Sequence, residues 1–351
     1  MKTSLRLKLF LYRFFSTSLG KVMLNFLSFG VNVKNLNGKK QKKHPFLVVI
    51  TVDTESGYVD KNDRRVWQKE NPKAYEGYYY GIRNLIGVFE RYKANVTFFL
   101  STNCFSANKE ERNLIKKQIN NIIKNNNEIG LHLHPDSDLA LQDKLKKKFE
   151  ATSAFFYDYN EKLEIVNTTK KLIETNLGKN IAKKLISVRW GNWALDTGGA
   201  KVLNKLGFKV DSSAAPGIKG HTDDTMKYDW SKVKRHYPWK LSIKDHQATD
   251  HNNSNIVEIP IATFDFFGMK LRADPVNSLL LNKAFVEYYK KADRLKKPFP
   301  FVVLTHSSEA TTKNGKSTQT LKDLEGFILF AKKFKDVKFV TIKEAYKSIK
   351  N

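Results

Sequence analysis

The chain has 351 residues, of which 41% are hydrophobic and 12% aromatic, and its formal net charge is +27. This apolar content is sufficient for a large core and excludes disorder over most of the chain. The length allows two average domains, but α/β barrels commonly use most of such a length as one domain. We therefore expect one large domain with a short appendage. A single cysteine, Cys104, excludes an internal disulfide.

The positive charge is spread along the chain. Lysines occur in pairs and triplets among many asparagines, and no nucleic-acid-binding motif accompanies them. We therefore expect no nucleic-acid partner and interpret the charge as a solvated basic surface. Attraction to anionic lipid or acidic glycan is the alternative interpretation.

Residues 1–44 form a separate N-terminal segment in the sequence. Leucines and phenylalanines alternate there with Arg6, Lys8 and Arg13, a pattern typical of a basic amphipathic helix. A transmembrane helix needs about 20 apolar residues in a row and is excluded, and charges inside the apolar stretch disfavour a secretory signal peptide. Peripheral membrane association and packing of this helix on the protein's own surface explain the pattern equally well. Residues 35–44 are predicted to form a linker to the main domain. We expect a cytoplasmic protein, located at the membrane surface if this helix binds lipid.

Strand-like apolar runs alternate with amphipathic helical stretches from residue 45 onward. This alternation predicts an α/β fold with parallel strands over 45–351. Residues 139–184 predict an inserted helical region, and 214–255 a long polar loop of the kind that is usually functional. The predicted strands are Phe46–Val52, Asn95–Leu100, Glu128–His132, Leu185–Trp190, Lys209–Asp211, Ile256–Ile261, Phe301–Thr305 and Val337–Val340. The predicted helices are Gly81–Tyr92, Lys109–Lys124, Asp196–Leu206, Pro275–Leu295 and Leu321–Phe334.

Ionisable residues collect where the predicted strands end. Asp53 and Glu55 follow the first strand, and His132 and His134 close the third. Residues i and i+2 of a strand share a face, so each pair converges, and strand carboxyl ends form the active site of β/α barrels. Such carboxylates and imidazoles are ligands for a divalent metal, which predicts a metal-dependent hydrolase. The other ionisable residues at predicted strand ends are Arg189, Asp211 and His306.

Five motifs follow one another along the chain, each at the end of a predicted strand. They are Thr51-Val52-Asp53-Thr54-Glu55, Gly130-Leu131-His132-Leu133-His134-Pro135, Arg189-Trp190-Gly191, Val210-Asp211-Ser212-Ser213 and Leu304-Thr305-His306-Ser307-Ser308-Glu309. In this order they resemble the polysaccharide deacetylase family, the NodB-homology carbohydrate esterases. The resemblance covers about 45–346, and within the family it is strongest to the WalW-like branch associated with surface-polysaccharide gene clusters. It implies a distorted barrel of seven or eight β/α units, a divalent metal, commonly zinc, and removal of N- or O-acetyl groups from sugars.

The resemblance implies three catalytic residues. Asp53 would be the catalytic base, which takes a proton from the attacking water. His306 would be the general acid that protonates the leaving group, a task that suits an imidazole near neutral pH. Arg189 would hydrogen-bond the Asp53 carboxylate and keep it ionised.

The resemblance also implies a metal site, with two departures from the family pattern. Glu55 would be a ligand where most members have adjacent aspartates, and His132 would be the second ligand. The family commonly has histidines four residues apart, and position 136 is an aspartate here, so the third ligand is either His134 or Asp136. We favour His134 because residues 132 and 134 share a face.

Three residues are predicted to act around the substrate. Glu309 would orient His306, unless it is a solvated loop residue. Asp211 would tune His306 or contact the sugar, unless it is a structural acid. Trp190 is preferred over Trp193 and other nearby aromatic residues as a platform that stacks on a sugar ring.

The sequence thus predicts a metal-dependent hydrolase, with zinc as the expected metal, that removes an acetyl group from a sugar of a cell-surface polysaccharide or its precursor. An amidase acting on a non-sugar C–N bond is one alternative. A catalytically inert glycan-binding scaffold is the other. The presence of Asp53 and His306 argues against the scaffold, because a binding module needs neither a base nor an acid.

Overall fold

The computed structural model describes residues 44–350, apart from 224–225, 267, 277, 293–294 and 296. The amphipathic segment and nearly all of the linker predicted at 1–44 therefore lie outside the described residues. Among the helices that are described, none combines the length and the apolar character needed to cross a bilayer.

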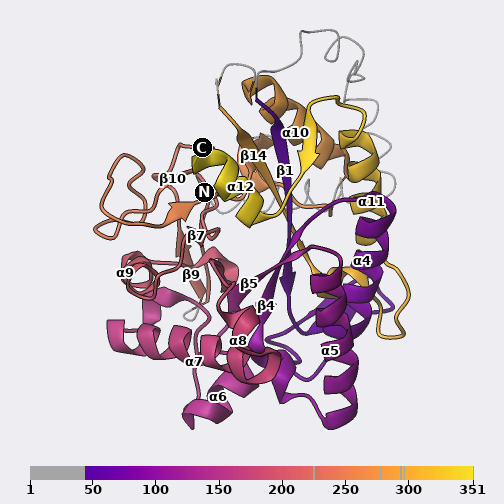
Figure 1. The fold of residues 1–351 in the computed structure, drawn as a ribbon, viewed down its shortest axis with the longest axis vertical. Coiled ribbons are helices and arrows are strands. Elements are labelled where there is room, and N and C mark those ends of the chain that lie inside the picture. Colours follow the sequence, from indigo (N-terminus) through magenta and orange to yellow (C-terminus); the bar gives the residue numbers. More distant parts are fainter. Residues whose placement is uncertain are drawn as a thin grey trace.

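A curled sheet of nine strands lies at the centre of the molecule (Figure 1). Neighbouring strands are parallel, except that β10 runs antiparallel to β11. From one edge to the other the strands are β10 (Trp239–Lys240), β11 (Val257–Glu258), β7 (Val210–Asp211), β6 (Ser187–Trp190), β5 (Glu128–Leu133), β4 (Thr97–Ser101), β1 (Phe46–Thr54) and β14 (Phe299–His306), with β15 (Val337–Phe339) pairing separately with β1.

The curl brings the two sides of the sheet together without a complete strand pair. Ile261, shortly after β11, forms an isolated parallel bridge to Val302 of β14. The backbone N–H of Ala262 donates to the carbonyl of Val302 at 3.0 Å, and that of Ile261 donates to the carbonyl of Ala214 at 2.8 Å. The segment after β11 therefore joins the β7 side of the sheet to β14. The predicted distorted β/α barrel is confirmed, and its distortion lies at this closure.

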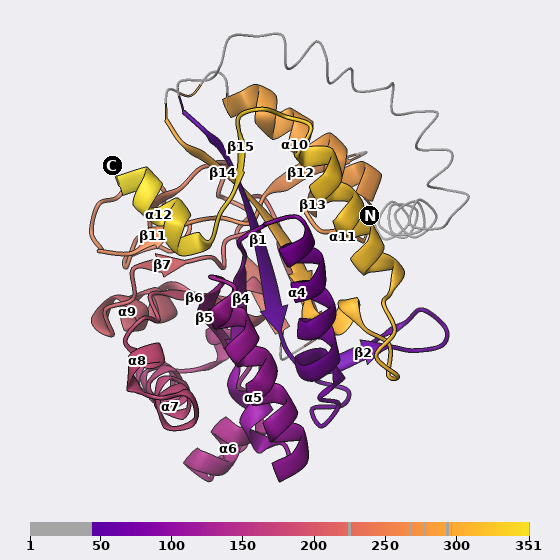
Figure 2. The ribbon, with the colours of Figure 1, turned by 45° about the vertical axis from the view of Figure 1, so that its right-hand side comes forward.

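Helices cover the outside of the curled sheet, and in Figure 2 α4 lies beside β1, with α5 below it on the other side. All five predicted helices are present among the described residues. Side-chain caps set their starts: Asp196 accepts from the N–H of Gly199 at 2.7 Å, and Asn108 accepts from that of Glu111 at 3.0 Å. The helices are α4 (Ile82–Arg91), α5 (Lys109–Lys124), α6 (Leu139–Leu145), α7 (Tyr159–Leu177), α8 (Lys179–Ala182), α9 (Thr197–Lys205), α10 (Ser278–Ala292), α11 (Gln319–Ala331) and α12 (Ile342–Lys350).

The alternation of side chains along β1 divides them between two cores. Leu47 and Val49 belong to a small core inside the barrel, to which α12 contributes Ile342. The intervening residues of β1 belong to the large core beneath the outer helices. Because the period is two, the face that begins with Leu47 continues into Thr51 and Asp53. The polar residues of the site therefore lie inside the barrel at the carboxyl end of its strands.

Three short hairpins follow the carboxyl ends of barrel strands. They are β2 (Gly57–Val59) with β3 (Arg65–Trp67), β8 (Lys219–Asp223) with β9 (Met226–Asp229), and β12 (Thr263–Phe266) with β13 (Met269–Arg272). The second hairpin and β10 lie within 214–255, the segment predicted as a long polar loop, so this segment contains short strands that the sequence did not reveal. Strands of two to five residues are too short for hydrophobic alternation to reveal them.

Candidate functional site

Strand register places the predicted residues at one end of the barrel. Asp53 of β1 lies opposite His306 of β14, and His132 of β5 lies opposite Arg189 of β6. Since parallel strands end at the same edge, residues far apart in sequence meet there. The structure therefore brings together the predicted base, acid, arginine and metal ligands.

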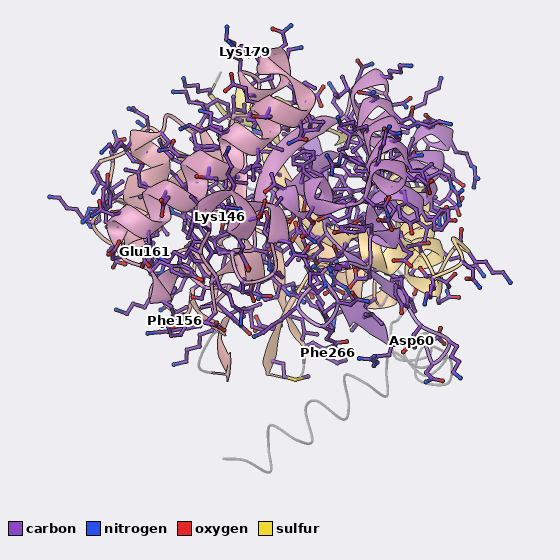
Figure 3. All side chains as sticks on the ribbon, turned by 90° about the horizontal axis from the view of Figure 1, so that it is seen from below. Asp60, Lys146, Phe156, Glu161, Lys179 and Phe266 are labelled. Atoms are coloured by element: carbon purple, nitrogen blue, oxygen red, sulfur yellow. The ribbon has the colours of Figure 1, made fainter. Side chains whose placement is uncertain are left out.

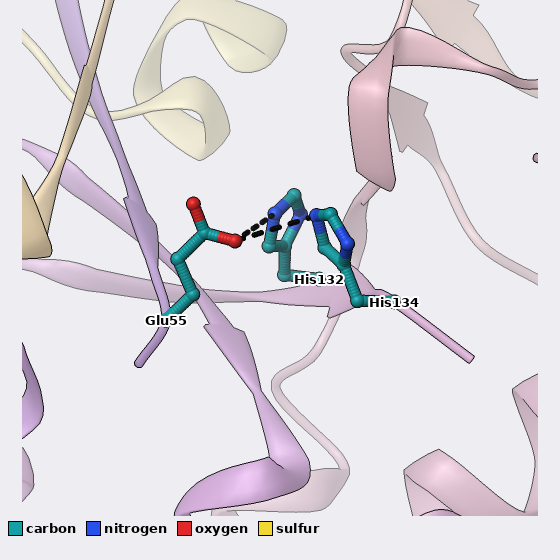
Figure 4. Close-up of side chains that lie close together, drawn as sticks. All are labelled: Glu55, His132 and His134. Atoms are coloured by element: carbon teal, nitrogen blue, oxygen red, sulfur yellow. Dashed lines mark ion pairs between the residues drawn. The ribbon is translucent and has the colours of Figure 1, made fainter. Parts of the chain in front are cut away.

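Glu55, His132 and His134 form a cluster in which one ligand atom from each lies within 4.8 Å of the others (Figure 4). The Glu55 Oε2 atom is 3.4 Å from Nε2 of His134 and 4.0 Å from Nε2 of His132. A tetrahedral metal with bonds near 2.1 Å needs ligand atoms about 3.4 Å apart. One carboxylate and two imidazoles with these separations fit a divalent metal such as zinc.

His132 is prepared for a ligand role by its surroundings. Its side chain is buried, and Nδ1 lies 3.1 Å from the backbone carbonyl of Arg189. A proton on Nδ1 satisfies that carbonyl and leaves the lone pair of Nε2 directed at Glu55. Burial lowers the pKa of His132 to about 4, so the ring is neutral at physiological pH, as a metal ligand must be.

The alternative ligand, Asp136, is engaged elsewhere. Its Oδ2 accepts from the Thr152 hydroxyl at 2.7 Å, and its Oδ1 lies 3.9 Å from Nδ1 of His134, on the side of that ring away from Glu55. Gly191 makes room for His134, because a Cβ at that position would lie 2.6 Å from the imidazole Nε2. These contacts favour His134 over Asp136 as the third ligand.

Asp53 is a buried carboxylate with one oxygen committed and one directed at the other site residues. Its Oδ1 accepts from Nη1 of Arg189 at 2.7 Å. Its Oδ2 lies 3.8 Å from Nε2 of His132 and 3.9 Å from Nε2 of His306. Burial by itself would raise the pKa of Asp53, but Arg189 and the two imidazoles outweigh it, and the pKa lies below its ordinary value. Asp53 is therefore held as an anion.

The two ring nitrogens of His306 face different carboxylates. Nε2 faces Asp53 and Glu55, and Nδ1 faces Glu309. The Nε2 atom is 3.7 Å from Oε1 of Glu55, and the Nδ1 atom is 3.1 Å from Oε2 of Glu309. Burial opposes ionisation of Glu309, but His306 and Arg65 hold its pKa well below its usual range. Glu309 therefore lies where it could orient His306, the role that the sequence predicts for it. Its side chain is not among those that line the pocket described below.

Arg65, on the short strand β3, is a site residue that the sequence did not reveal. Its Nη2 donates to Glu55, and its Nη1 donates to Glu309 at 3.2 Å. Burial opposes ionisation of Glu55, but Arg65 and the neighbouring imidazoles keep the pKa of Glu55 below its ordinary value. One guanidinium therefore fixes both a candidate metal ligand and the carboxylate that orients His306.

A pocket of about 540 Å³ opens over these residues, with Asp53, Glu55 and His306 among those lining it. Tryptophans from separate elements form parts of its wall. Trp67 of β3 is 46% exposed, its ring lies 3.8 Å from the Arg65 guanidinium carbon, and its centroid lies 6.1 Å from that of His306. Trp193 follows β6. The pocket therefore offers aromatic surfaces for a ring-shaped substrate.

The backbone at Trp193 is unusual. Asn192 and Trp193 both have positive φ, 51° and 55°, a conformation that is rare for residues with side chains and rarer still for bulky ones. The Trp193 carbonyl accepts from Nε1 of Trp230 at 2.8 Å. Strained residues held by surrounding contacts are concentrated at functional sites. This turn directs Trp193 toward the pocket.

Two predicted substrate contacts are corrected by the structure. Trp190 is fully buried and donates from Nε1 to the Thr152 carbonyl at 2.8 Å, so it cannot stack on a sugar. Arg189 points into the barrel, and the next residue of a strand must point out of it. Asp211 is also fully buried, pairs in register with Val188 on the outer face, and does not line the pocket.

Asp211 instead forms a buried carboxyl pair with Glu258 of the adjacent strand β11. Burial and the nearby Asp211 carboxylate raise the pKa of Glu258 well above its usual value, so Glu258 retains its proton. Asp211 accepts from the Ser213 hydroxyl at 2.8 Å. This is a structural role, which was one of the interpretations open for Asp211.

No protein-family model matches the chain, and no curated protein matches it. Solved structures do match. A protein of Mycobacterium smegmatis assigned as a polysaccharide deacetylase aligns with a TM-score of 0.54 and 15% identity, over 89% of this chain and 92% of that one. A protein of Parabacteroides distasonis assigned as a glycoside hydrolase or deacetylase aligns with a TM-score of 0.60 and 13% identity, over 87% of this chain and 71% of that one. An allantoinase aligns with a TM-score of 0.52 and 10% identity, over 92% of this chain and 97% of that one.

Identities this low show the fold alone. The chain has the NodB-type fold of the polysaccharide deacetylases, which confirms the resemblance at the level of fold. The WalW-like branch stays a prediction.

Proposed function

We propose that this protein is a metal-dependent hydrolase that removes an acetyl group from a sugar. The observation that carries the proposal is the convergence, around one pocket, of a three-ligand cluster, an ionised buried carboxylate and an imidazole supported by a second carboxylate. Hydrolysis of an acetamide or acetyl ester needs an activated water, stabilisation of the oxyanion and a proton for the leaving group. The pocket contains a candidate for each task.

Glu55, His132 and His134 would hold the metal, with zinc as our choice from the donor set. When bound, such a metal supplies a water of lowered pKa and polarises the acetyl carbonyl. Asp53 then serves as the base. Arg189 occupies its Oδ1 and keeps it ionised, which leaves Oδ2 to accept the proton of the attacking water.

His306 donates a proton to the departing sugar nitrogen or oxygen. Glu309 at Nδ1 fixes the ring so that Nε2 faces Asp53 and Glu55, inside the pocket. The Glu309 carboxylate also stabilises the protonated ring, which an acid catalyst must form in each cycle. Arg65 keeps Glu309 in place.

An acetylated glycan suits the pocket better than a small planar ureide. Trp67 and Trp193 provide apolar surfaces of the kind that pack on the faces of pyranose rings. We further propose that the substrate is a cell-surface polysaccharide or its precursor and that the enzyme acts on the cytoplasmic side of the membrane. The spread of positive charge supports attraction to an acidic glycan or lipid.

The test combines metal content with acetate release. We expect about one zinc per chain after reconstitution, and acetate release from N-acetylated oligosaccharides that requires the metal. Asp53→Asn and His306→Gln should lose activity by about 100-fold or more. Full activity in either variant would refute its assigned role.

Two other outcomes would replace the proposal. Hydrolysis of allantoin without release of acetate from sugars would favour the amidase alternative, to which the allantoinase neighbour points. Failure to take up zinc, together with binding of glycans, would favour the inert scaffold.

A further inference from the structure

A second pocket of about 310 Å³ adjoins the active-site pocket. The two share wall residues, Trp193 and Tyr228, whose ring centroids lie 5.5 Å apart in an edge-to-face arrangement. The β12–β13 hairpin and the start of α10 contribute most of the remaining wall. In Figure 3, Phe266 at the end of β12 and Asp60 in the β2–β3 turn lie along the same side of the molecule. A substrate reaching beyond Trp193 would therefore enter the second pocket.

The wall of the second pocket is mainly apolar. Ile218, Met269 and Leu271 line it and are only partly buried, unlike the side chains of the two cores. Phe264 and Leu280 are buried behind them. Partly exposed aliphatic side chains gathered in a concave site suit an apolar ligand, because burying them against it removes apolar surface from water.

A cation lies where the two pockets meet. The guanidinium carbon of Arg272 lies 3.8 Å from the centre of the Trp193 ring, and its Nη2 is 3.6 Å from Oδ2 of Asp274. The other basic residue of the wall, Lys270, pairs with Asp265 at 2.7 Å. Arg272 is about one-quarter exposed in its side chain and lines the second pocket together with Asp274, and a guanidinium has more donors than this one carboxylate contact uses. A guanidinium in this position matches a phosphate.

We propose that the second pocket binds an apolar chain that is joined to the acetylated sugar through a phosphate, so that the substrate is a lipid-linked sugar. The sugar lies beside Trp193 in the first pocket, the phosphate at Arg272, and the beginning of the chain among Ile218, Met269 and Leu271. This inference rests on the proposed function, because it places the acetylated sugar in the first pocket. The apolar wall and the Arg272 guanidinium beside Trp193 match this order of groups along the ligand.

The test compares three soluble probes by calorimetry on the full chain, below their micellar concentrations. They are N-acetylglucosamine 1-phosphate, its n-octyl phosphodiester, and octyl N-acetylglucosaminide without phosphate. We expect the phosphodiester to bind at least about tenfold more tightly than either of the others, since each buried methylene contributes about fourfold. Equal affinities for all three probes would overturn the proposal.

Two variants and a matched control locate the binding. Leu271→Asn should remove the gain from the octyl chain, and Arg272→Gln should remove the gain from the phosphate. Leu329→Asn, at an exposed leucine of α11 outside the pocket, should change neither. A gain that survives Leu271→Asn would place the chain elsewhere. Tighter binding of an N-acetylglucosamine tetrasaccharide, lost in Leu271→Asn, would assign the pocket to neighbouring sugars.

Acetate release separates this inference from the proposed function. Tighter binding of the phosphodiester without acetate release from any probe would sustain the second pocket and refute the deacetylase. Acetate release from the chain-free sugar without any gain from the chain would sustain the deacetylase and refute the lipid-linked substrate.

Discussion

Arg189 and Asp53 form a buried ion pair across the barrel interior, with Nη1 and Oδ1 2.7 Å apart. Both side chains are almost entirely removed from water. The arginine has further partners: Nη1 donates to the Thr51 hydroxyl at 2.9 Å, and Nε and Nη2 donate to the carbonyl and hydroxyl of Ser212 at 2.8 and 3.0 Å. The pair is therefore asymmetric: the guanidinium is satisfied from several sides, whereas among the described residues the Asp53 carboxylate accepts a hydrogen bond from Arg189 alone.

This asymmetry predicts unequal effects on stability. Arg189→Met should lower the free energy of unfolding by about 3–5 kcal/mol, because it leaves a buried carboxylate without its counter-charge. Asp53→Asn should cost less, since Arg189 keeps its bonds to Thr51 and Ser212 and an amide oxygen can still accept. Urea unfolding of both variants measures the difference. Equal losses would show that the pair, rather than the wider network, stabilises the barrel.

Arg65 is predicted to act through Glu55 and Glu309. Arg65→Met should lower metal affinity or activity by about 10–100-fold, the usual effect of losing a group that orients a ligand. Arg64→Met is the matched control, because Arg64 is largely exposed and pairs with Asp60 and Glu70 at the surface. Zinc titration and acetate release should both distinguish the variants. If Arg64→Met has the same effect, loss of surface charge is the cause.

Substitution of Trp67, which lines the pocket, and of Trp190, which lies in the core, should have different effects. Trp67→Ala should raise KM for a sugar substrate and change the free energy of unfolding by less than about 1 kcal/mol, since Trp67 is 46% exposed. Trp190→Ala should cost about 3–5 kcal/mol, because it opens a cavity in the large core. Thermal unfolding and steady-state kinetics check both. A stable Trp190→Ala variant with a raised KM would return Trp190 to the substrate site.

The third metal ligand can be identified by zinc titration. His134→Ala should weaken zinc binding by about 100-fold or more, beyond the usual effect of an orienting residue. Asp136→Asn preserves the bond from Thr152 and should have a smaller effect, up to about tenfold. The reverse order of losses would make Asp136 the ligand.

Asp138 predicts a pH dependence of stability. Burial raises the pKa of Asp138 to about 6, whereas an unfolded aspartate titrates near about 3.9. Between these values the folded state keeps a proton that the unfolded state has released, so this residue makes the protein less stable as the pH rises through that window. An asparagine cannot ionise and can still cap α6 through the N–H of Leu141.

The effect of Asp138→Asn on the free energy of unfolding should therefore be more favourable by about 2 kcal/mol near pH 8 than near pH 4.5. Urea unfolding at the two pH values gives this difference. A pH-independent effect would show that Asp138 ionises normally in the folded protein.

The central part of the site could be predicted from the sequence because its geometry is local. Asp53 and Glu55, and likewise His132 and His134, are two residues apart at the ends of buried strands, and the pleat of a strand alone puts each pair on one face. The parallel barrel followed from the alternation of strands and helices, since parallel strands need long crossovers. The sequence by itself determined these features, because each depends on the backbone period of one element.

The tertiary structure decided which face of a strand points into the barrel and which residues a side chain contacts. Arg65 and Trp67 lie on a strand of three residues, which carries no periodic signal, and their roles come from contacts with Glu55, Glu309 and the pocket. Trp190 was misplaced because a motif shows adjacency along the chain and not direction. Once Arg189 points inward, the same period that unites Asp53 with Glu55 turns Trp190 outward into the core. Which face is inward depends on how the sheet curls, and that is set by contacts between strands distant in sequence.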